Sequence, residues 1–418
     1  MRIMLNSLLS GYRALDLSNE KGAICGKILA ALGVETIKVE PPGGDPMRGI
    51  PPFLDGKQGI NKGLHWLAYN TDKRSITLNL EREQGRELFK KIASNCDFVI
   101  ESFQPGYLHS IGIGYSVLEQ INPRIILTSI TPFGQQGPYS GFKGSELVVS
   151  AMSGIMSTNG DADRPPLREG LDTMYFESNA AAALGTVIAH HVRETTGVGQ
   201  QVDVSMQEVA AKRTSSNLIM WEFDKRLIKR AGAIRTIGAR STRWIWECKD
   251  GYIFWSFMGG QPGSQGNRAM SKWIDDDGVD NPMRVITNWE EFDMAAQDVS
   301  KELLDAQQEA ISQLFLRHTK REITEEGLKR GLNACVIHDP ADILSNSQLK
   351  ARGYWTAIRD PENGLPINYP KYFFLSNETE NFVNSAAPVA GEYNDVIYKQ
   401  ELKLTDKEIA DLENSGVI

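Results

Sequence analysis

Short runs of apolar residues alternate with longer segments of helical period through the first half of the chain. Runs of four to eight apolar residues are typical of buried strands, and apolar positions three and four apart are typical of helices that cover a sheet. The alternation predicts an α/β fold with a mostly parallel, doubly wound sheet. The predicted strands are YRALDL (12–17), VETIKVE (34–40), SITLNL (75–80), DFVIESF (97–103) and RIILTSI (124–130), and the predicted helices are 22–33, 81–95 and 116–121.

The pattern of apolar, polar and basic residues changes in the second half of the chain. SNAAAALGTVIAHHVRE (178–194) predicts a helix capped by Ser178 or Asn179, followed by a further strand in TGVGQQVDVSM. Beyond about residue 225, basic residues crowd the chain, a turn and strand follow in KDGYIFWSF, and polar helices are predicted from about 289 to 331. This change indicates a second, smaller lobe, after which strand-like pieces and a terminal helix complete the chain.

Phosphate-binding loops are only weakly indicated. In a doubly wound sheet the ligand crevice lies at the carboxyl ends of the strands. The first strand–helix turn, LDLSNEKGAICG, lacks G-x-G-x-x-G, so a dinucleotide site is not favoured although Glu40 lies where a ribose-binding acid is expected. MGGQPGSQG (258–266) is a glycine-rich loop that could hold an anion through its amides, but a plain surface turn is the favoured interpretation.

Composition narrows the class of protein. A chain of 418 residues with 41% hydrophobic residues is long enough for two packed lobes. A net charge of −8 without a basic cluster disfavours a nucleic-acid partner. The four cysteines lie far apart, which favours reduced thiols over disulfides or a metal site. Charges and Gly11 interrupt the apolar N-terminal run, so we expect a cytoplasmic protein without a membrane span.

Familiar catalytic motifs are missing. His190 and His191 are adjacent on a predicted helix and point about 100° apart, so they cannot chelate one metal ion as an i, i+4 pair can. There is no G-x-S-x-G elbow, Walker loop or H-E-x-x-H helix. The cations near predicted strand ends, where a phosphorylated ligand would lie, are Lys73, Arg74, Lys143 and Arg48.

Six segments that run through most of the chain give it a family resemblance. They are LDL followed by GVETIKVEPPGGDPMR, YNTDKRSITLNL, FVIESFQPGYLHSIGIGY, NPRIILTSITPFGQQGPYS, VRETTGVGQQVDVSM and the tail AAPVAGEYNDVI. In this order they resemble the class III, or CaiB/BaiF, CoA-transferases. The resemblance implies a Rossmann-like large domain built from 1–225 and a returning segment 336–418, a small domain over 226–335, and two interlocked subunits.

The resemblance also implies a reaction and a nucleophile. Such enzymes move coenzyme A from an acyl-CoA to a free carboxylate, through an aspartate that carries first an acyl group and then CoA. That aspartate is expected five residues after Gly170 and ten before Gly185, and both counts end at Tyr175. A tyrosine is neutral near pH 7 and a poor substitute. Asp172 and Glu177 flank the position and are the fallback carboxylates. If the chain before Tyr175 is extended, Asp172 lies about 10 Å from residue 175.

The resemblance also implies which residues bind coenzyme A. The matching residues are Lys73 and Lys143 as cations, Phe103 as an aromatic platform and Glu146 as an active-site acid. Two further positions differ from the family pattern, because Pro41 and Ser110 stand where formyl-CoA transferases have CoA-contacting arginines. The glycine loop of those enzymes maps near 237–242, IGARST, and is largely absent. The histidine of the related racemases is missing from Phe142-Lys143-Gly144, which disfavours racemisation.

We therefore expect the non-catalytic subunit of a heteromeric class III CoA-transferase, in an interlocked heterodimer or heterotetramer with a homologous chain that keeps the aspartate. The complex would move CoA from an acyl-CoA such as succinyl-CoA to an acid such as benzylsuccinate, with no cofactor and no metal. Two alternatives remain open. One is a self-sufficient homodimeric transferase that uses Glu177 or Asp172, and the other is a CoA-binding or structural protein without transferase activity.

Overall fold

The protein forms two compact units. The structure, a computed structural model, describes residues 7–237, 240–292, 300–359, 364–371, 373–377 and 383–418. Unit 1 contains residues 1–155, 168–226 and 347–418, so both ends of the chain belong to it. Unit 2 contains residues 156–167 and 227–346.

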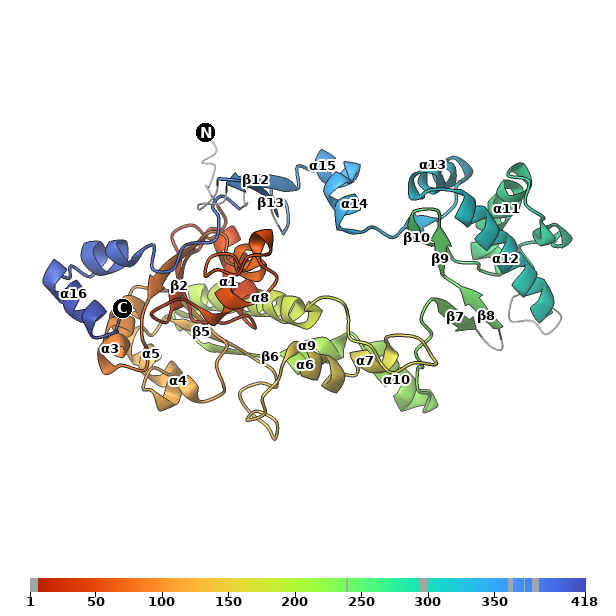
Figure 1. The fold of residues 1–418 in the computed structure, drawn as a ribbon. Coiled ribbons are helices and arrows are strands. Elements are labelled where there is room, and N and C mark those ends of the chain that lie inside the picture. Colours follow the sequence, from red (N-terminus) through yellow and green to blue (C-terminus); the bar gives the residue numbers. More distant parts are fainter. Residues whose placement is uncertain (1–6, 238–239, 293–299, 360–363, 372, 378–382) are drawn as a thin grey trace. The chain divides into compact units, whose positions relative to one another are not determined.

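A six-stranded parallel sheet is the centre of unit 1 (Figure 1). Its strand order, β3-β2-β1-β4-β5-β6, is that of the Rossmann fold. The α/β fold class predicted from the alternating pattern is confirmed. The strands are β1 (Arg13–Asp16), β2 (Glu35–Glu40), β3 (Lys73–Thr77), β4 (Phe98–Glu101), β5 (Ile126–Thr131) and β6 (Gln201–Ser205).

Strand order reverses between β1 and β4, and this is where a doubly wound sheet opens a crevice. The chain leaves β1 at Asp16 and β4 at Glu101, at the same edge of the sheet. Just beyond, the Ser102 hydroxyl accepts the amide N–H of Asn19 and donates to its side-chain oxygen, each at 2.9 Å. The two strand ends are thereby joined.

Helices cover both faces of this sheet, because neighbouring strand residues point in opposite directions. Leu15 belongs to the core that includes α3 and α5, whereas Ala14 belongs to the core that includes α1, α8 and α9. The bounds are α1 (Ala23–Ala31), η1 (Pro46–Gly49), η2 (Leu54–Gly56), α2 (Leu64–Tyr69), α3 (Glu83–Ala93), α4 (Tyr107–Ser110), α5 (Tyr115–Ile121), α6 (Glu146–Met152), α8 (Thr173–Thr196), α9 (Met206–Lys212), α10 (Ser215–Asp224) and α15 (Ser347–Ala351).

The C-terminal segment packs against the far edge of the sheet. The Tyr398 hydroxyl donates to the carbonyl of Thr77 at the end of β3, at 2.6 Å, and the Asn79 amide donates to the carbonyl of Val417, at 2.7 Å. Val417 and Ile397 lie in the same core as α3. The elements of this segment are β12 (Trp355–Arg359), β13 (Pro366–Pro370), a π-helix, η4 (Asp395–Glu401), and α16 (Asp406–Asn414).

Helix α8 begins earlier than the sequence predicts. Ser178 and Asn179 were the predicted caps, and this prediction is wrong, since the N-cap is Asp172. The Ser178 hydroxyl donates to the Met174 carbonyl, and the Asn179 side-chain oxygen accepts the amide N–H of Cys25 on α1. Both side chains are therefore used inside the helix and in packing. Position 175 lies in the first turn of α8, so the chain from Asp172 to Tyr175 is not extended.

Unit 2 has its own core beneath an antiparallel sheet of order β11-β10-β9. Trp246, Trp255 and Phe315 meet within it at ring-centroid distances of 6.0 to 6.4 Å. The predicted loop at 258–266 is mostly helical, because α11 begins at Gly260. The elements are α7 (Ile155–Thr158), which starts in unit 1, β7 (Ile234–Ile237), β8 (Arg240–Arg243), β9 (Ile245–Cys248), β10 (Gly251–Phe254), α11 (Gly260–Asp276), η3 (Pro282–Val285), α12 (Lys301–Arg317), α13 (Lys320–Arg330), β11 (Cys335–Val336) and α14 (Pro340–Ser345).

Candidate functional site

Tyr175 is built into the packing of unit 1. Its ring belongs to the core of α1, α8 and α9 and is 9% exposed. Its hydroxyl oxygen accepts the amide N–H of Glu146, the first residue of α6, at 3.0 Å. Burial, together with the acids Glu20 and Asp172, raises the pKa of the phenol further above its ordinary value. The group is therefore a neutral phenol that holds the start of a helix.

Glu146 brings a buried carboxyl close to the same point. Its side chain is almost fully buried, and Oε2 accepts a hydrogen bond from the Arg168 guanidinium at 3.3 Å. Oε1 has no hydrogen-bond partner among the described residues. Burial raises the pKa of Glu146, and the charge of Arg168 opposes that rise. The sequence-predicted acid and Tyr175 therefore do lie together.

The two fallback carboxylates are each held by an arginine. Asp172 lies 3.5 Å from the Arg168 guanidinium, which thus bridges Asp172 and Glu146. Glu177 lies 3.4 Å from Arg213. Burial raises the pKa of Glu177, and Arg213 acts against this. Neither arginine was singled out from the sequence, although Arg168 lies one helical turn's spacing before Asp172.

Two adjoining cavities meet at these residues. The larger has a volume of about 570 Å³ and is lined by Asp172, Phe176 and Glu177, together with residues just before α8 such as Gly170 and Leu171. The smaller, about 100 Å³, reaches Tyr175. Three residues line both cavities: His65, Tyr69 and Asp172. Tyr175, Asp172 and Glu177 therefore surround connected space, with the phenol in its wall.

Lys73, a predicted CoA ligand, lies inside the protein. It is the first residue of β3 and is 3% exposed. Its ammonium donates to the Asp16 carboxylate, the Ala23 carbonyl and the Asn70 side chain, at 2.7 to 2.8 Å. An ammonium has three N–H donors, so this arrangement leaves none for a ligand.

Arg48, another cation near a strand end, is also buried. It makes two hydrogen bonds to the Glu40 carboxylate, at 2.6 and 2.7 Å, and its guanidinium stacks 3.6 Å above the Trp66 ring. Further bonds run to Asn61 and to the Pro388 carbonyl. The Glu40 carboxylate is thereby engaged by an arginine rather than open to a ribose.

The remaining predicted CoA residues differ in exposure. Phe103 follows β4 at the crevice, is half-buried, and its ring centroid is 4.7 Å from that of Tyr107. Lys143 is exposed in the segment between β5 and α6. Of the predicted cations, Lys143 is thus reachable by a ligand and Lys73 is not. Gly238 and Ala239, within the segment where the family's glycine loop maps, lie outside the described residues.

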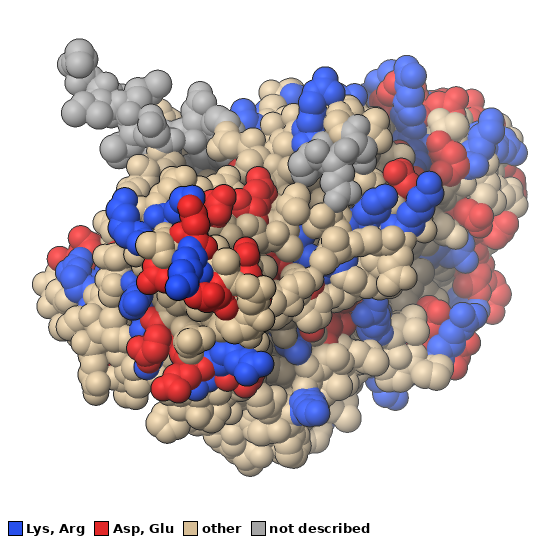
Figure 2. All heavy atoms as spheres, turned by 60° about the vertical axis from the view of Figure 1, so that its left-hand side comes forward, with Lys and Arg blue, Asp and Glu red and all other residues tan. Residues whose placement is uncertain are grey.

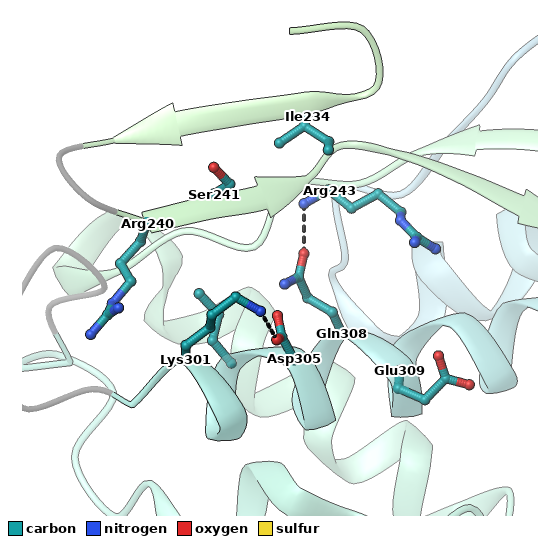
Figure 3. A pocket seen from close by; sticks show the side chains of 9 residues that line it. Ile234, Arg240, Ser241, Arg243, Lys301, Asp305, Gln308 and Glu309 are labelled. Carbon is teal, nitrogen blue, oxygen red and sulfur yellow. Dashed lines mark hydrogen bonds and ion pairs between the residues drawn. The ribbon is translucent and has the colours of Figure 1, made fainter. Parts of the chain in front are cut away.

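Unit 2 contains a separate cavity of about 440 Å³, shown in Figure 3. Its lining contains both cations and acids. Lys301 pairs with Asp305, and the Gln308 side chain accepts the amide N–H of Arg243 at 2.7 Å. The mixed charges do not single out an anion as its ligand.

Charged side chains of both signs are mixed on the surface. On the part of unit 1 that Figure 2 brings forward, Lys and Arg are interspersed with Asp and Glu. Within the described ranges, no three His, Cys, Asp or Glu side chains are grouped so that they could hold a metal ion. In the same part of the chain, no helix has the length and apolar character needed to cross a bilayer.

Comparisons with known proteins give the context of this site. The profile of CoA-transferase family III matches residues 9–394. The subunit BbsE of succinyl-CoA:(R)-benzylsuccinate CoA-transferase from Thauera aromatica is 31% identical over 389 residues, 92% of each chain. The succinyl-CoA–D-citramalate CoA-transferase of Chloroflexus aurantiacus is 30% identical over 400 residues, 95% of this chain and 94% of that one. A CaiB/BaiF family protein from Brucella suis has a structure that superposes with a TM-score of 0.81 at 25% identity, covering 95% of this chain and all of that one.

Proposed function

Because the chain belongs to CoA-transferase family III, we propose that it is the non-catalytic subunit of a heteromeric CoA-transferase. The complex would move coenzyme A from an acyl-CoA such as succinyl-CoA to a free acid such as benzylsuccinate. The choice of donor is supported by the two relatives above, both named for succinyl-CoA. The single observation behind the non-catalytic role is Tyr175 at the nucleophile position.

The chemistry of the relay explains why a tyrosine cannot replace an aspartate. The aspartate carboxylate attacks the donor thioester, which forms a mixed anhydride and releases CoA thiolate. The thiolate then attacks the enzyme's own carbonyl carbon, so that CoA is held as an enzyme thioester and the donor acid leaves. The acceptor carboxylate reverses these two steps and departs as its CoA ester. A phenol has no carbonyl carbon, so Tyr175 could accept an acyl group as an ester but could never carry CoA.

The local contacts support a structural role for this phenol. Its hydroxyl oxygen is the acceptor for the amide of Glu146, and burial raises its pKa. Phenolate, the nucleophilic form, is therefore even scarcer at neutral pH than for an exposed tyrosine. The site of reaction would then lie on the partner chain.

Exposed apolar helix faces support a large partner. On α8, Leu184 is 61% and Ile188 54% exposed, and Val192 continues the row at the same four-residue spacing. On α10 no residue is buried, and Phe223 is 84% exposed. Contiguous apolar surface of this kind is typical of an interface. A homologous chain that interlocks with this one would cover it, and L184D is expected to weaken that association in gel filtration, with L328D on the charged helix α13 as the matched control.

The decisive experiment measures exchange of labelled succinate into succinyl-CoA. The purified chain alone is expected to give no exchange above a blank without protein. Addition of a homologous chain that has Asp at the position of Tyr175, sought in the neighbouring gene, is expected to restore it. Exchange by this chain alone would refute the non-catalytic role.

The competing enzyme is a self-sufficient homodimer that uses Glu177 or Asp172. It is favoured by the position of both carboxylates in the lining of the 570 Å³ cavity, and disfavoured by their arginine contacts. Incubation with succinyl-CoA and then hydroxylamine or borohydride separates the two, because only a carboxylate that has formed a thioester becomes modified. Peptide mass spectrometry would locate a hydroxamate or an alcohol at residue 172 or 177.

The third alternative is a CoA-binding or structural protein. It predicts that no homologous chain co-purifies with this one and that none is encoded nearby. Recovery of a stable complex with an aspartate-bearing homologue would exclude it.

A further inference from the structure

Unit 1 contains a second cavity, beside the one that Asp172 and Glu177 line. Its volume is about 640 Å³, within the range of small-molecule sites. Tyr69 and Phe176 belong to the lining of both cavities. The walls are mainly aromatic and aliphatic. They come from α1, α2, the start of α8 and the C-terminal segment, and include Ile24, Leu64, Leu67, Tyr354, Tyr369 and Phe373.

Two cations line this mainly apolar wall, Lys27, which is buried, and Lys371, which is partly exposed. Lys27, on α1, is 9% exposed, and its ammonium donates to the Ala68 carbonyl at 2.5 Å. In the described part of the chain no carboxylate lies within ion-pair distance of it. The acid that acts on it from a distance is Asp72, whose Oδ1 already accepts the amides of Asn384 and Ser385.

This arrangement is unfavourable without a ligand. A lysine ammonium has three donors, and only one is used here. Burying a charge without a counter-charge is unfavourable, and burial, together with the neighbouring Lys73, lowers the pKa of Lys27 to about 8. The ammonium still carries a proton at pH 7. A ligand that brought one negative charge would relieve this cost.

We propose that the cavity binds a carboxylic acid with an apolar body, and that the Lys27 ammonium holds its carboxylate. The aromatic lining would bury the body by the hydrophobic effect. A single buried ammonium matches one carboxylate. The inference goes beyond the proposed function and does not depend on it, because it concerns binding by this chain whether or not the chain takes part in CoA transfer.

Calorimetric titration of the full-length chain, in the assembly in which it purifies, tests the proposal at pH 7. The probes are 3-phenylpropanoate and 3-phenylpropan-1-ol, which share the apolar body and differ in charge. The acid is expected to bind about tenfold more tightly, or better, than the alcohol, the ratio given by one charge-assisted hydrogen bond. Equal affinities, or no saturable binding of the acid, would overturn the proposal.

Three variants assign the effect to this lysine. K27M keeps the length of the side chain and removes its charge, so it should weaken the acid about tenfold and leave the alcohol unchanged. K27R should preserve the preference for the acid. K21M, just before α1 and outside the lining of the cavity, is the matched control and should behave as the unmodified chain. Acid binding that survives K27M, in a protein with an unchanged circular dichroism spectrum, would place the ligand elsewhere.

L64W tests the cavity itself without touching the charge. Leu64 lines the cavity and is partly exposed, so a larger ring there narrows the space with little strain on the core. Both probes should lose affinity together. Loss of the acid alone would contradict an apolar site. The succinate exchange assay is independent of all these titrations, so the failure of either proposal leaves the other in place.

Discussion

Tyr175→Phe isolates the hydrogen bond between the Tyr175 hydroxyl and the amide of Glu146. The ring stays, so no void opens in the core of α1, α8 and α9. The amide N–H of Glu146, which lies 3.0 Å from the phenol oxygen and is buried, loses its acceptor. Leaving a buried donor unsatisfied costs about 1–3 kcal/mol, because the group had given up water to make this bond. We expect a loss of about 1–2 kcal/mol in the free energy of unfolding, or about 1–2 °C in the melting temperature.

The assay is urea unfolding followed by circular dichroism, with Tyr139→Phe as the control. Tyr139 is 44% exposed in the loop after β5, so its hydroxyl faces solvent and the change should stay within about 0.5 kcal/mol. In the assembled complex, Tyr175→Phe should change the rate of CoA transfer less than about twofold, since the reacting groups are proposed to lie on the partner. Unchanged stability would refute the capping role of the hydroxyl, and a large loss of turnover in a folded complex would show that it takes part in the chemistry.

Three further substitutions test the packing of unit 1. Burial raises the pKa of Glu101 from its ordinary 4.5 to about 7, so between these values the folded state holds a proton that the unfolded state has lost. The stability of the unmodified chain therefore falls as the pH rises through this window, and E101Q should gain about 3 kcal/mol relative to it between pH 4.5 and pH 8 in urea titrations. An E101Q chain without this pH-dependent gain would contradict this prediction. R48M leaves the buried Glu40 carboxylate without its bidentate partner and should cost about 3–5 kcal/mol by the same method, a value below about 1 kcal/mol being the refutation. In G199A the new methyl would lie 1.9 Å from the Ile125 carbonyl oxygen and should cost about 1–3 kcal/mol, whereas G141A meets nothing within 4 Å and should melt like the unmodified chain.

The parallel sheet could be predicted because its strands are buried on both faces and read as continuous apolar runs. Strand 34–40 of the prediction became Glu35–Glu40, a shift of one residue. The start of α8 could not be predicted in the same way. Ser178 and Asn179 have the chemistry of N-caps, but Asn179 accepts a hydrogen bond from Cys25, a residue 154 positions away. A cap preference is local, and the contact that overrides it is not.

The same contrast between local sequence signals and long-range contacts applies to the candidate site. The family resemblance located Tyr175, because the two glycines from which the position is counted, Gly170 and Gly185, are close in sequence. The role of Lys73 depends on Asp16, 57 residues earlier, and on how the chain crosses from β1 to β3. Nothing in the sequence around a lysine at a strand end tells whether it faces water or an internal carboxylate. Lys27 escaped notice for the complementary reason, since GKILAA reads as an ordinary helix and its apolar surroundings form only once α2 and the C-terminal segment are in place.

The environment of Tyr175 fits a structural role for this side chain. A carboxylate that must be attacked by CoA has to stay accessible and reactive, whereas this phenol is buried, has its pKa raised and is engaged by a helix amide. Those properties favour packing over reactivity, and a protein that sits near its stability threshold gains from such an exchange when the position no longer serves catalysis. A chain released from carrying the acyl group could also keep an unpaired cation such as Lys27 in an apolar wall, provided that a ligand or the assembly compensates its charge. Both features agree with the proposed function, in which the covalent chemistry takes place on another chain.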